Sequence, residues 1–532
     1  MKQFKKETLS FKVSSLLTFC LLIMCIISFG LTTTSVAAEP QRGGTIYARF
    51  AAEPRTLDPH MVTTTEEDGL LCNLYNRLMR WNKDMSKLEP DLVESLSRPD
   101  DRTLVIKLRK GVHFHNVPPV NGRELTSEDV KYSIERAAGM HGKKQRFMAR
   151  SRFEGKIESI TTPDKYTVIF KTKEPYAPFL RYASASAIVA REAVDKFGDL
   201  GRRAIGTGPF ILKDYLKGSH LTLVRNPNYF KKGLPYLDKI IFKFIPSSAA
   251  NMSAFLAGKI DNTQVYFFQL ATIEKEAPTA TVVKQKGNLT WVLRVPPVTD
   301  THPLKPPFDS KKVRQAISMA IDKAKLLKVA WGGYGTVQVG SIPNRPPYSL
   351  PASDQVEYNP EKARKYLAEA GYPNGFTTEL LTWNQPYMTK PAQVAKEMLK
   401  EVGINAEIKA LPMAQYFTRV YKYDYDMSLH IMACSDDPDH GLTPTFGRNS
   451  TYYKWKNEEI WDLIENESKT MDPKKRVAVI REVQRKLVDD APVTFLYTTN
   501  IFTAFQPRVF PKDTYLNPFQ MFLFEQTWLT KK

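Results

Sequence analysis

Two extended apolar segments limit the possible folds of this chain most strongly, because one precedes its helix-rich half and the other follows it. The first is residues 291–295, Trp-Val-Leu-Arg-Val, and the second is residues 493–497, Val-Thr-Phe-Leu-Tyr. A chain that leaves one domain, builds a second and returns must cross between the two domains twice. The sequence therefore predicts an inserted second lobe, with these two segments as the crossing strands.

Local signals divide the chain into a strand-rich first part and a helix-rich second part. Asn359-Pro360 and Asp472-Pro473 each place proline at the first helical position, directly after a capping residue. Thr126-Ser-Glu-Asp129 is a capping-box pattern, which predicts a helix start in the first part. Apolar side chains at helical spacing are Val313, Ala316, Ile317, Ala320 and Ile321. Strand candidates are residues 44–50, 103–108, 166–170, 221–225 and 240–244.

Residues 1–38 have the pattern of a secretory signal peptide. Lysines come first, an apolar run spans residues 16–31, and small residues end at Ala38, where we place the cut. An uncleaved anchor stays open as an alternative, because about 20 apolar residues span a bilayer and residues 13–38 carry no charge. The mature part is expected in the periplasm, or tethered there by its N-terminus.

Length and charge narrow the class of protein. The chain has 532 residues, which is enough for two or three domains. Its net charge of +20 can indicate binding to nucleic acid, but both signs are mixed and there is no long Lys/Arg block. We therefore expect a solvated surface and no nucleic-acid partner. Two cysteines, Cys72 and Cys434, follow the signal segment, and the sequence leaves open whether they pair.

The search for catalytic motifs finds none of the common ones. G-x-S-x-G, H-E-x-x-H, the P-loop and C-x-x-C are all missing from the sequence. Gly206-Thr-Gly208 is followed at once by proline and does not open a helix, unlike a dinucleotide loop. His113 and His115 could share a strand face and hold a metal, but a structural pair is the favoured interpretation. The prediction is a binding protein, not an enzyme, without metal or cofactor.

Many short segments in one order resemble the family 5 solute-binding proteins, which include the oligopeptide, dipeptide and nickel receptors of ABC importers. The segments are residues 43–46, 53–60, 74–78, 90–95, 107–115, 125–130, 205–210, 225–229, 257–261, 307–309, 313–317, 369–372 and 472–476. A single segment of this kind would be weak evidence. The shared order is specific, and it covers nearly the whole mature chain.

The resemblance implies an α/β fold of two lobes, the periplasmic-binding-protein fold, with two hinge strands and an extra subdomain on lobe one. Lobe one would comprise residues 39–290 and 496–532, with the extra subdomain at about 81–203, and lobe two residues 291–495. The implied function is that of an extracytoplasmic receptor, a monomer that captures a small solute between its lobes. It would deliver that solute unchanged to an inner-membrane ABC permease complex.

The resemblance also argues against a free dipeptide as the ligand. Dipeptide receptors of the family hold the amine with an acidic residue before an Asp-Pro, and the carboxylate with an arginine before a Pro-Tyr. The matching positions here are Cys434 and Gln385. Asp436 could reach the amine if the alignment shifts by two residues. We therefore expect an uncharged or weakly charged, partly apolar ligand: a modified peptide, a glycoside-like or opine-like compound, or a metal chelate.

The expected ligand-binding residues come from both lobes. They are Thr63, Thr64, Thr65, Trp383, Asn384, Gln385, Tyr387, Met432, Cys434 and Asp436. For the two aromatic residues the alternative is a place in the lobe core, for Gln385 an exposed turn, and for Cys434 plain packing. Rival functions are a peptide-binding chaperone or chemosensory receptor that uses the same cleft, and an extracytoplasmic hydrolase.

Overall fold

The computed structural model describes residues 39–532 except 63, 84–86, 142–146, 148, 300–301, 344–345, 434–436, 451, 513–521 and 531–532. The chain divides at residues 41 and 42, and every element below belongs to the unit of residues 42–532. The predicted signal segment lies outside the described residues, as do Thr63, Cys434 and Asp436. No helix of the described part combines the length and the apolar character that crossing a bilayer requires.

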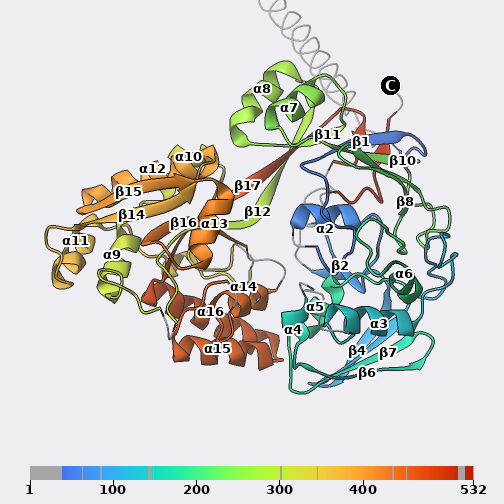
Figure 1. The fold of residues 1–532 in the computed structure, drawn as a ribbon, viewed down its shortest axis with the longest axis horizontal. Coiled ribbons are helices and arrows are strands. Elements are labelled where there is room, and N and C mark those ends of the chain that lie inside the picture. Colours follow the sequence, from blue (N-terminus) through green and yellow to red (C-terminus); the bar gives the residue numbers. More distant parts are fainter. Residues whose placement is uncertain are drawn as a thin grey trace, which may run out of the picture. The chain divides into compact units, whose positions relative to one another are not determined.

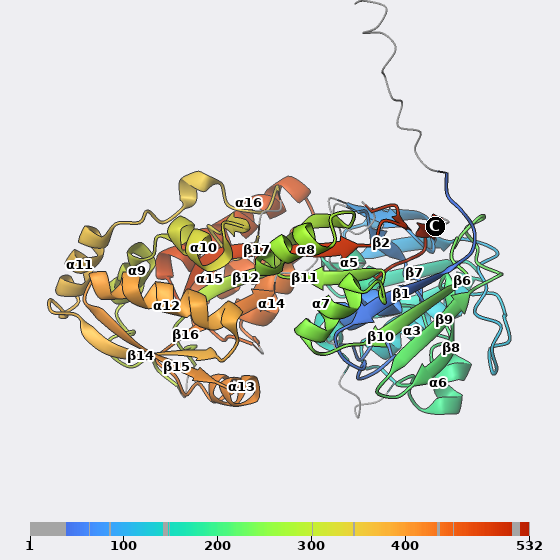
Figure 2. The ribbon, with the colours of Figure 1, turned by 90° about the horizontal axis from the view of Figure 1, so that it is seen from above.

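One eleven-stranded sheet runs through this unit in the order β15-β14-β16-β12-β17-β11-β1-β10-β9-β8, with β13 paired to β17. Its strands are β1 (Thr45–Phe50), β8 (Phe210–Leu216), β9 (His220–Arg225), β10 (Lys239–Phe244), β11 (Asn262–Val265), β12 (Thr281–Arg294), β13 (Gly335–Val337), β14 (Phe376–Trp383), β15 (Ile404–Leu411), β16 (Met427–Ala433) and β17 (Val493–Phe505). Figure 2 shows β1, β10, β9 and β8 as successive neighbours. Strands from the first and the last parts of the chain therefore share one sheet.

Strands β12 and β17 connect the two halves of this sheet (Figure 1). They pair antiparallel along most of their length. Residues 289–294 of β12 also pair with β16, whereas residues 502–505 of β17 also pair with β11. The two predicted crossing segments thus lie within longer strands. The pairing register shifts between Lys286 and Thr290, where Gly287 lies.

Gly287 permits close contact of the crossing strands. A Cβ atom at this position would lie 2.1 Å from the carbonyl oxygen of Thr499. We expect Gly287→Ala to force β12 and β17 apart and to lower the free energy of unfolding by about 1–3 kcal/mol, the usual cost of overpacking. Urea denaturation measures the change. Lys286→Ala, at an exposed neighbouring position, is the control; equal midpoints for the two variants would contradict the prediction.

Two large hydrophobic cores form on either side of the crossing strands. One comprises residues of 46–242 and 505–529, and the other comprises residues of 291–497. A smaller core surrounds Phe255, between α7 (Ser248–Leu256) and Phe502 of β17. The lobe boundaries at 290/291 and 495/496 stay a proposal, and the second core also includes Leu496 and Tyr497.

A second sheet of four strands, in the order β4-β5-β7-β6, lies within the proposed extra subdomain. Its strands are β4 (Val93–Asp100), β5 (Thr103–Leu108), β6 (Ile157–Asp164) and β7 (Thr167–Thr172). The helices of this region are α3 (Ser127–Ala137), α4 (Arg150–Phe153), α5 (Phe179–Ala185) and α6 (Arg191–Phe197). Helix α3 packs against β6 and β7.

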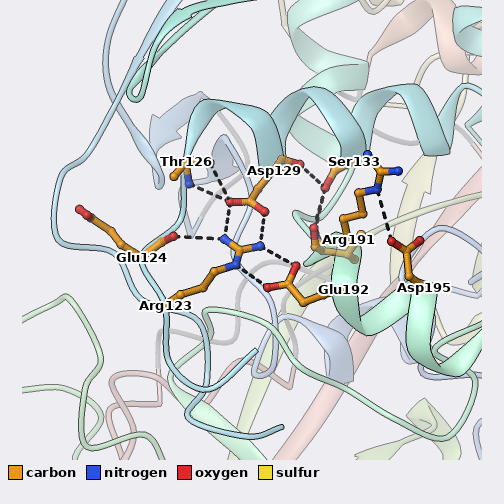
Figure 3. Close-up of polar contacts among 9 residues, drawn as sticks. Arg123, Glu124, Thr126, Asp129, Ser133, Arg191, Glu192 and Asp195 are labelled. Carbon is orange, nitrogen blue, oxygen red and sulfur yellow. Dashed lines mark hydrogen bonds and ion pairs between the residues drawn. The ribbon is translucent and has the colours of Figure 1, made fainter. Parts of the chain in front are cut away.

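The start of α3 confirms the predicted capping box (Figure 3). The Asp129 carboxylate accepts hydrogen bonds from the Thr126 backbone N–H at 2.8 Å and from the Thr126 hydroxyl at 3.2 Å. Arg123 donates to the same carboxylate and to Glu192 on α6. One arginine thus ties the starts of two helices together.

The helices of the second core follow the predicted starts. They are α9 (Lys311–Ala320), α10 (Lys323–Trp331), α11 (Pro360–Glu369), α12 (Pro386–Glu401), α13 (Met413–Tyr421), α14 (Pro438–Phe446), α15 (Glu458–Lys469) and α16 (Pro473–Asp490), with the short η2 (Ala352–Asp354). Asn359 and Asp472 cap α11 and α16 by accepting the backbone N–H of Lys362 and of Lys475. The remaining elements are α2 (Thr65–Leu71), α8 (Leu270–Glu276), η1 (Phe267–Gln269), β2 (Met79–Trp81), β3 (Leu88–Pro90), β18 (Val509–Phe510) and β19 (Trp528–Leu529).

Residues 522–529 return to complete the first core. The Asn73 side chain donates to the Phe522 carbonyl at 2.6 Å and accepts the Phe524 N–H at 3.0 Å. Glu525, which is buried, forms ion pairs with Arg80 and Lys231. These contacts join segments that lie far apart in the sequence.

Candidate ligand-binding cavity

A cavity of about 440 Å³ opens between side chains of the two large cores. The first core contributes residues around α2, β2, α4 and α5, and the second contributes residues of β12, β16, α13 and α14. Protein cavities that hold small molecules commonly measure about 300–1,000 Å³. The volume therefore suits a small solute.

The floor of the cavity on the second core is a sheet face. Arg294 of β12 pairs with Ser428 of β16, and side chains two residues apart on a strand share a face. His430 and Met432 consequently lie on the same side as Arg294, and all three line the cavity. Helix α13 adds the rings of Phe417 and Tyr421, which stack at 5.9 Å between centroids.

The lining is strongly basic. It contains Arg77, Arg80, Arg152, Arg181 and Arg294 but a single carboxylate among the described residues, Asp68. Arg77 pairs with Asp68, and Arg80 pairs at 2.6 Å with Glu525 behind the lining. These two positive charges are thereby neutralised within the protein.

Arg294 and Arg152 have no such neutralisation, because no carboxylate of the described residues lies within ion-pair distance of either guanidinium. Arg294 is 4% exposed, and its Nε donates to the Ser428 hydroxyl at 3.3 Å. Arg152 contacts the His440 ring and lies over the face of Tyr182. The described lining of the cavity therefore carries net positive charge.

Two histidines of the lining, His60 and His430, do not add to this charge at neutral pH. Burial and the nearby Arg294 hold the pKa of His430 well below its usual value. Burial lowers the pKa of His60 to about 4, and Arg136 contributes to the same effect. Both rings are therefore neutral, and the positive potential comes from arginine.

Contacts next to the cavity join the extra subdomain to the second core. The Tyr182 hydroxyl on α5 donates to the Asp439 carboxylate on α14, and the Ala177 N–H donates to the Ser468 carbonyl at 2.8 Å. At the start of α14, Asp437 forms an ion pair with Arg476, and Arg476 also pairs with Glu467. Burial raises the pKa of Glu467 well above its usual value.

The structure brings three of the predicted site residues to the cavity: Thr64, Thr65 and Met432. Thr64 also caps α2 by accepting the Glu67 N–H at 3.2 Å.

Four other predicted residues are not among the lining side chains. Trp383 is 4% exposed and packs against Tyr416 and Phe417. This is the place in the core that the sequence left open as the alternative to a ligand contact. Tyr387 accepts a hydrogen bond from the Trp383 indole at 3.2 Å. Asn384 and Gln385 are exposed at the start of α12. A role of these four in binding stays a prediction.

Other sequence features have structural roles. His115 is buried and bonds to the backbone of Gly206 and Gly208, and His113 bonds to the carbonyl of Gly122. Across the described residues, no cluster of three potential metal ligands occurs. Cys72 is a buried free thiol, and burial raises its pKa to about 12. Cys434, the cysteine with which Cys72 could pair, lies outside the described residues.

Sequence reasoning missed the arginines of the cavity. One signal was available, because Arg294 interrupts the apolar segment 291–295 and a charged side chain in a buried strand needs an explanation. Arg152 gave no such signal, since it stands in a polar stretch. The segments around them lie far apart in the sequence, and only the fold places both at one cavity.

Residues 87–453 match the family model described as "Bacterial extracellular solute-binding proteins, family 5 Middle". The chain belongs to this family. This solute-binding protein is 26% identical to the glutathione-binding protein GsiB of Pectobacterium atrosepticum, over 95% of this chain and 98% of the relative. It is 25% identical to GsiB of Escherichia coli K12, over 90% and 94% of the two chains.

Solved structures agree with this assignment. The periplasmic binding protein DppA of Helicobacter pylori, in complex with peptide STSA, matches with a TM-score of 0.78 and 26% identity, over 92% of this chain and 99% of that one. AgaA of A. tumefaciens R10, in complex with agropinic acid, matches with a TM-score of 0.75, 26% identity and the same coverage. The two-lobed α/β fold expected from the sequence is confirmed, and this solute-binding protein is a substrate-binding receptor of the ABC-importer type, whose relatives named above are binding proteins.

Proposed function

We propose that this solute-binding protein captures one small solute in the basic cavity and delivers it unchanged to an inner-membrane ABC permease complex. The observation that carries the proposal is the cavity itself, which is lined by side chains of both cores, while β12 and β17 connect those cores. A ligand that touches both cores favours the state in which they are close together. Release then needs only the separation of the cores, without any chemical step.

Peptide-like, opine-like and chelate ligands all remain within the proposal. The relatives carry names that refer to glutathione, a peptide and agropinic acid. The expectation of an uncharged ligand is replaced here by that of an acidic one, because the described lining has five arginines and one carboxylate. A free dipeptide still fits poorly, since Asp68 is already paired with Arg77. We also propose a periplasmic location, a signal segment of residues 1–38 and a monomeric state.

Native mass spectrometry of protein purified without refolding tests the proposal. We expect one small molecule per chain, recovered chemically intact, and solution scattering that shows a more compact particle with the molecule than without it. Conversion of the recovered molecule would favour the rival hydrolase. Binding of many unfolded peptides without one-to-one saturation would favour a chaperone.

A further inference from the structure

We propose that the guanidinium of Arg294 anchors a carboxylate group of the solute, so that the protein selects small carboxylic acids. This inference rests on the proposed function, because it assumes that the solute occupies the cavity. It goes further than the proposed function by naming the side chain that binds the carboxylate of the solute. Arg294 is the last residue of β12, and it lines the cavity beside His430 and Met432.

The hydrogen bonds of Arg294 leave its outer edge available. Its Nε donates to Ser428, and the rings of Tyr425 and Tyr453 flank the guanidinium, at 5.8 and 5.3 Å from their centroids. The guanidinium also interacts with the Tyr416 hydroxyl, and no carboxylate or carbonyl group of the described residues accepts a hydrogen bond from its terminal nitrogens. A carboxylate can accept two parallel N–H bonds from such an edge.

The described side chains around Arg294 do not supply a negative charge to its guanidinium. The Tyr425 and Tyr453 hydroxyls both donate to the carbonyl of Val295. His430 is neutral, and its Nδ1 is bonded to the Tyr416 hydroxyl at 2.7 Å. A buried cation without a counter-charge is unfavourable, whereas the same cation paired with a ligand carboxylate is satisfied. No described residue supplies this anion, and we infer that the solute does.

Other side chains of the cavity lining indicate the chemistry of the rest of the solute. Arg152 presents a second guanidinium from α4, which suits a second acidic or polar group. Phe417 and the largely exposed Tyr421 and Tyr452 present aromatic surface, on which apolar or ring portions can lie. The arrangement fits a compact solute with at least one carboxylate and some apolar surface.

The test compares wild type with Arg294→Met and Arg294→Lys. The probes are glutathione, agropinic acid, glutarate and inorganic phosphate, and each carboxylic acid is paired with its methyl ester. We expect at least one acid to raise the melting temperature of wild type while its ester does not. Arg294→Met should weaken that acid by ~100-fold, the scale of losing a desolvated charge partner. Arg294→Lys should recover part of the affinity, because it keeps the charge but not the planar fork.

Stability without ligand separates recognition from a structural role. Arg294→Met should melt no lower than wild type, because it removes a buried charge that has no partner. Arg314→Met is the matched control, since Arg314 is equally buried but pairs with Asp490 at 2.6 Å. It should melt lower than wild type and keep the preference for acids over esters.

Three outcomes would overturn the inference. Esters could bind as well as acids, phosphate alone could bind, or Arg294→Met could bind the acid as tightly as wild type does. In each case the protein would still be a receptor. If neither a probe nor a co-purified solute binds to wild type, the proposed function itself fails.

Discussion

Replacing Arg476 by methionine is expected to lower the free energy of unfolding by about 3–5 kcal/mol, the range for breaking a buried ion pair from one side. Arg476 is 6% exposed, and its guanidinium reaches Asp437 at 2.5 Å and Glu467 at 3.0 Å. Methionine fills the space but leaves the buried carboxylate of Asp437 without a counter-charge. Urea denaturation at pH 7 measures the loss.

Two further variants test the cause of that loss. Arg485→Met lies on the same helix, α16, but its pair with Asp354 is largely solvated, so its effect should stay within about 1 kcal/mol. Adding Asp437→Asn and Glu467→Gln to Arg476→Met should recover part of the stability, because no buried charge remains. If Arg476→Met is as stable as Arg485→Met, the ion pairs of Arg476 with Asp437 and Glu467 do not stabilise the fold.

Mild acid is expected to unfold the protein, because the buried His60 and His115 and the partly buried His430 are neutral in the folded state. Burial lowers the pKa of His60 and of His115 to about 4, and the pKa of His430 lies well below its usual value of 6.5. Between pH 6.5 and pH 4 the unfolded chain therefore binds more protons at these positions than the folded chain. Their stabilising contribution is complete above pH 6.5 and is lost as the pH falls.

Buried carboxyl groups partly oppose this effect. The raised pKa values of Glu66 and Glu467 mean that the folded state holds protons there which the unfolded state has released. Carboxyl groups whose pKa is lowered in the folded state, such as Glu67 and Glu525, act in the same direction as the histidines, so unfolding takes up protons overall. The linkage relation converts each proton of net uptake into a loss of about 1.4 kcal/mol for each pH unit of acidification.

Urea midpoints at pH 7, 6 and 5 check the prediction. His115→Gln should reduce the slope by about 1.4 kcal/mol per pH unit, because it removes one titrating group. Ser353→Ala, at an exposed side chain that does not titrate, is the control and should leave the slope unchanged. A slope that does not change in His115→Gln would show that this ring is protonated in the folded state.

The elements that the sequence predicted well depend on residues that lie next to one another. The helix starts at Asn359 and Asp472 and the capping box at Thr126 each involve four neighbouring residues, so the pattern contains the whole interaction. The crossing strands were predictable because an apolar segment 291–295 and its counterpart 493–497 bracket the helical half. The fold class followed from these signals together with the family resemblance.

The cavity was harder to predict, because the same residue types serve both a core and a binding site. Trp383 packs against other rings, although it was expected among the ligand-binding residues. The arginines were overlooked because arginine is usually solvated, and the sequence does not show which ones lack a carboxylate. That distinction requires the positions of Asp68 and Glu525 relative to Arg77 and Arg80.

The return of residues 522–529 to the first core has a consequence for biogenesis. Arg80 pairs with Glu525, which is synthesised 445 residues later. Until then a nascent chain lacks the carboxylate that neutralises Arg80 and Lys231, and the aromatic rings that close the first core are not yet made. We therefore expect the first core to be completed only after residues 522–529 have been synthesised.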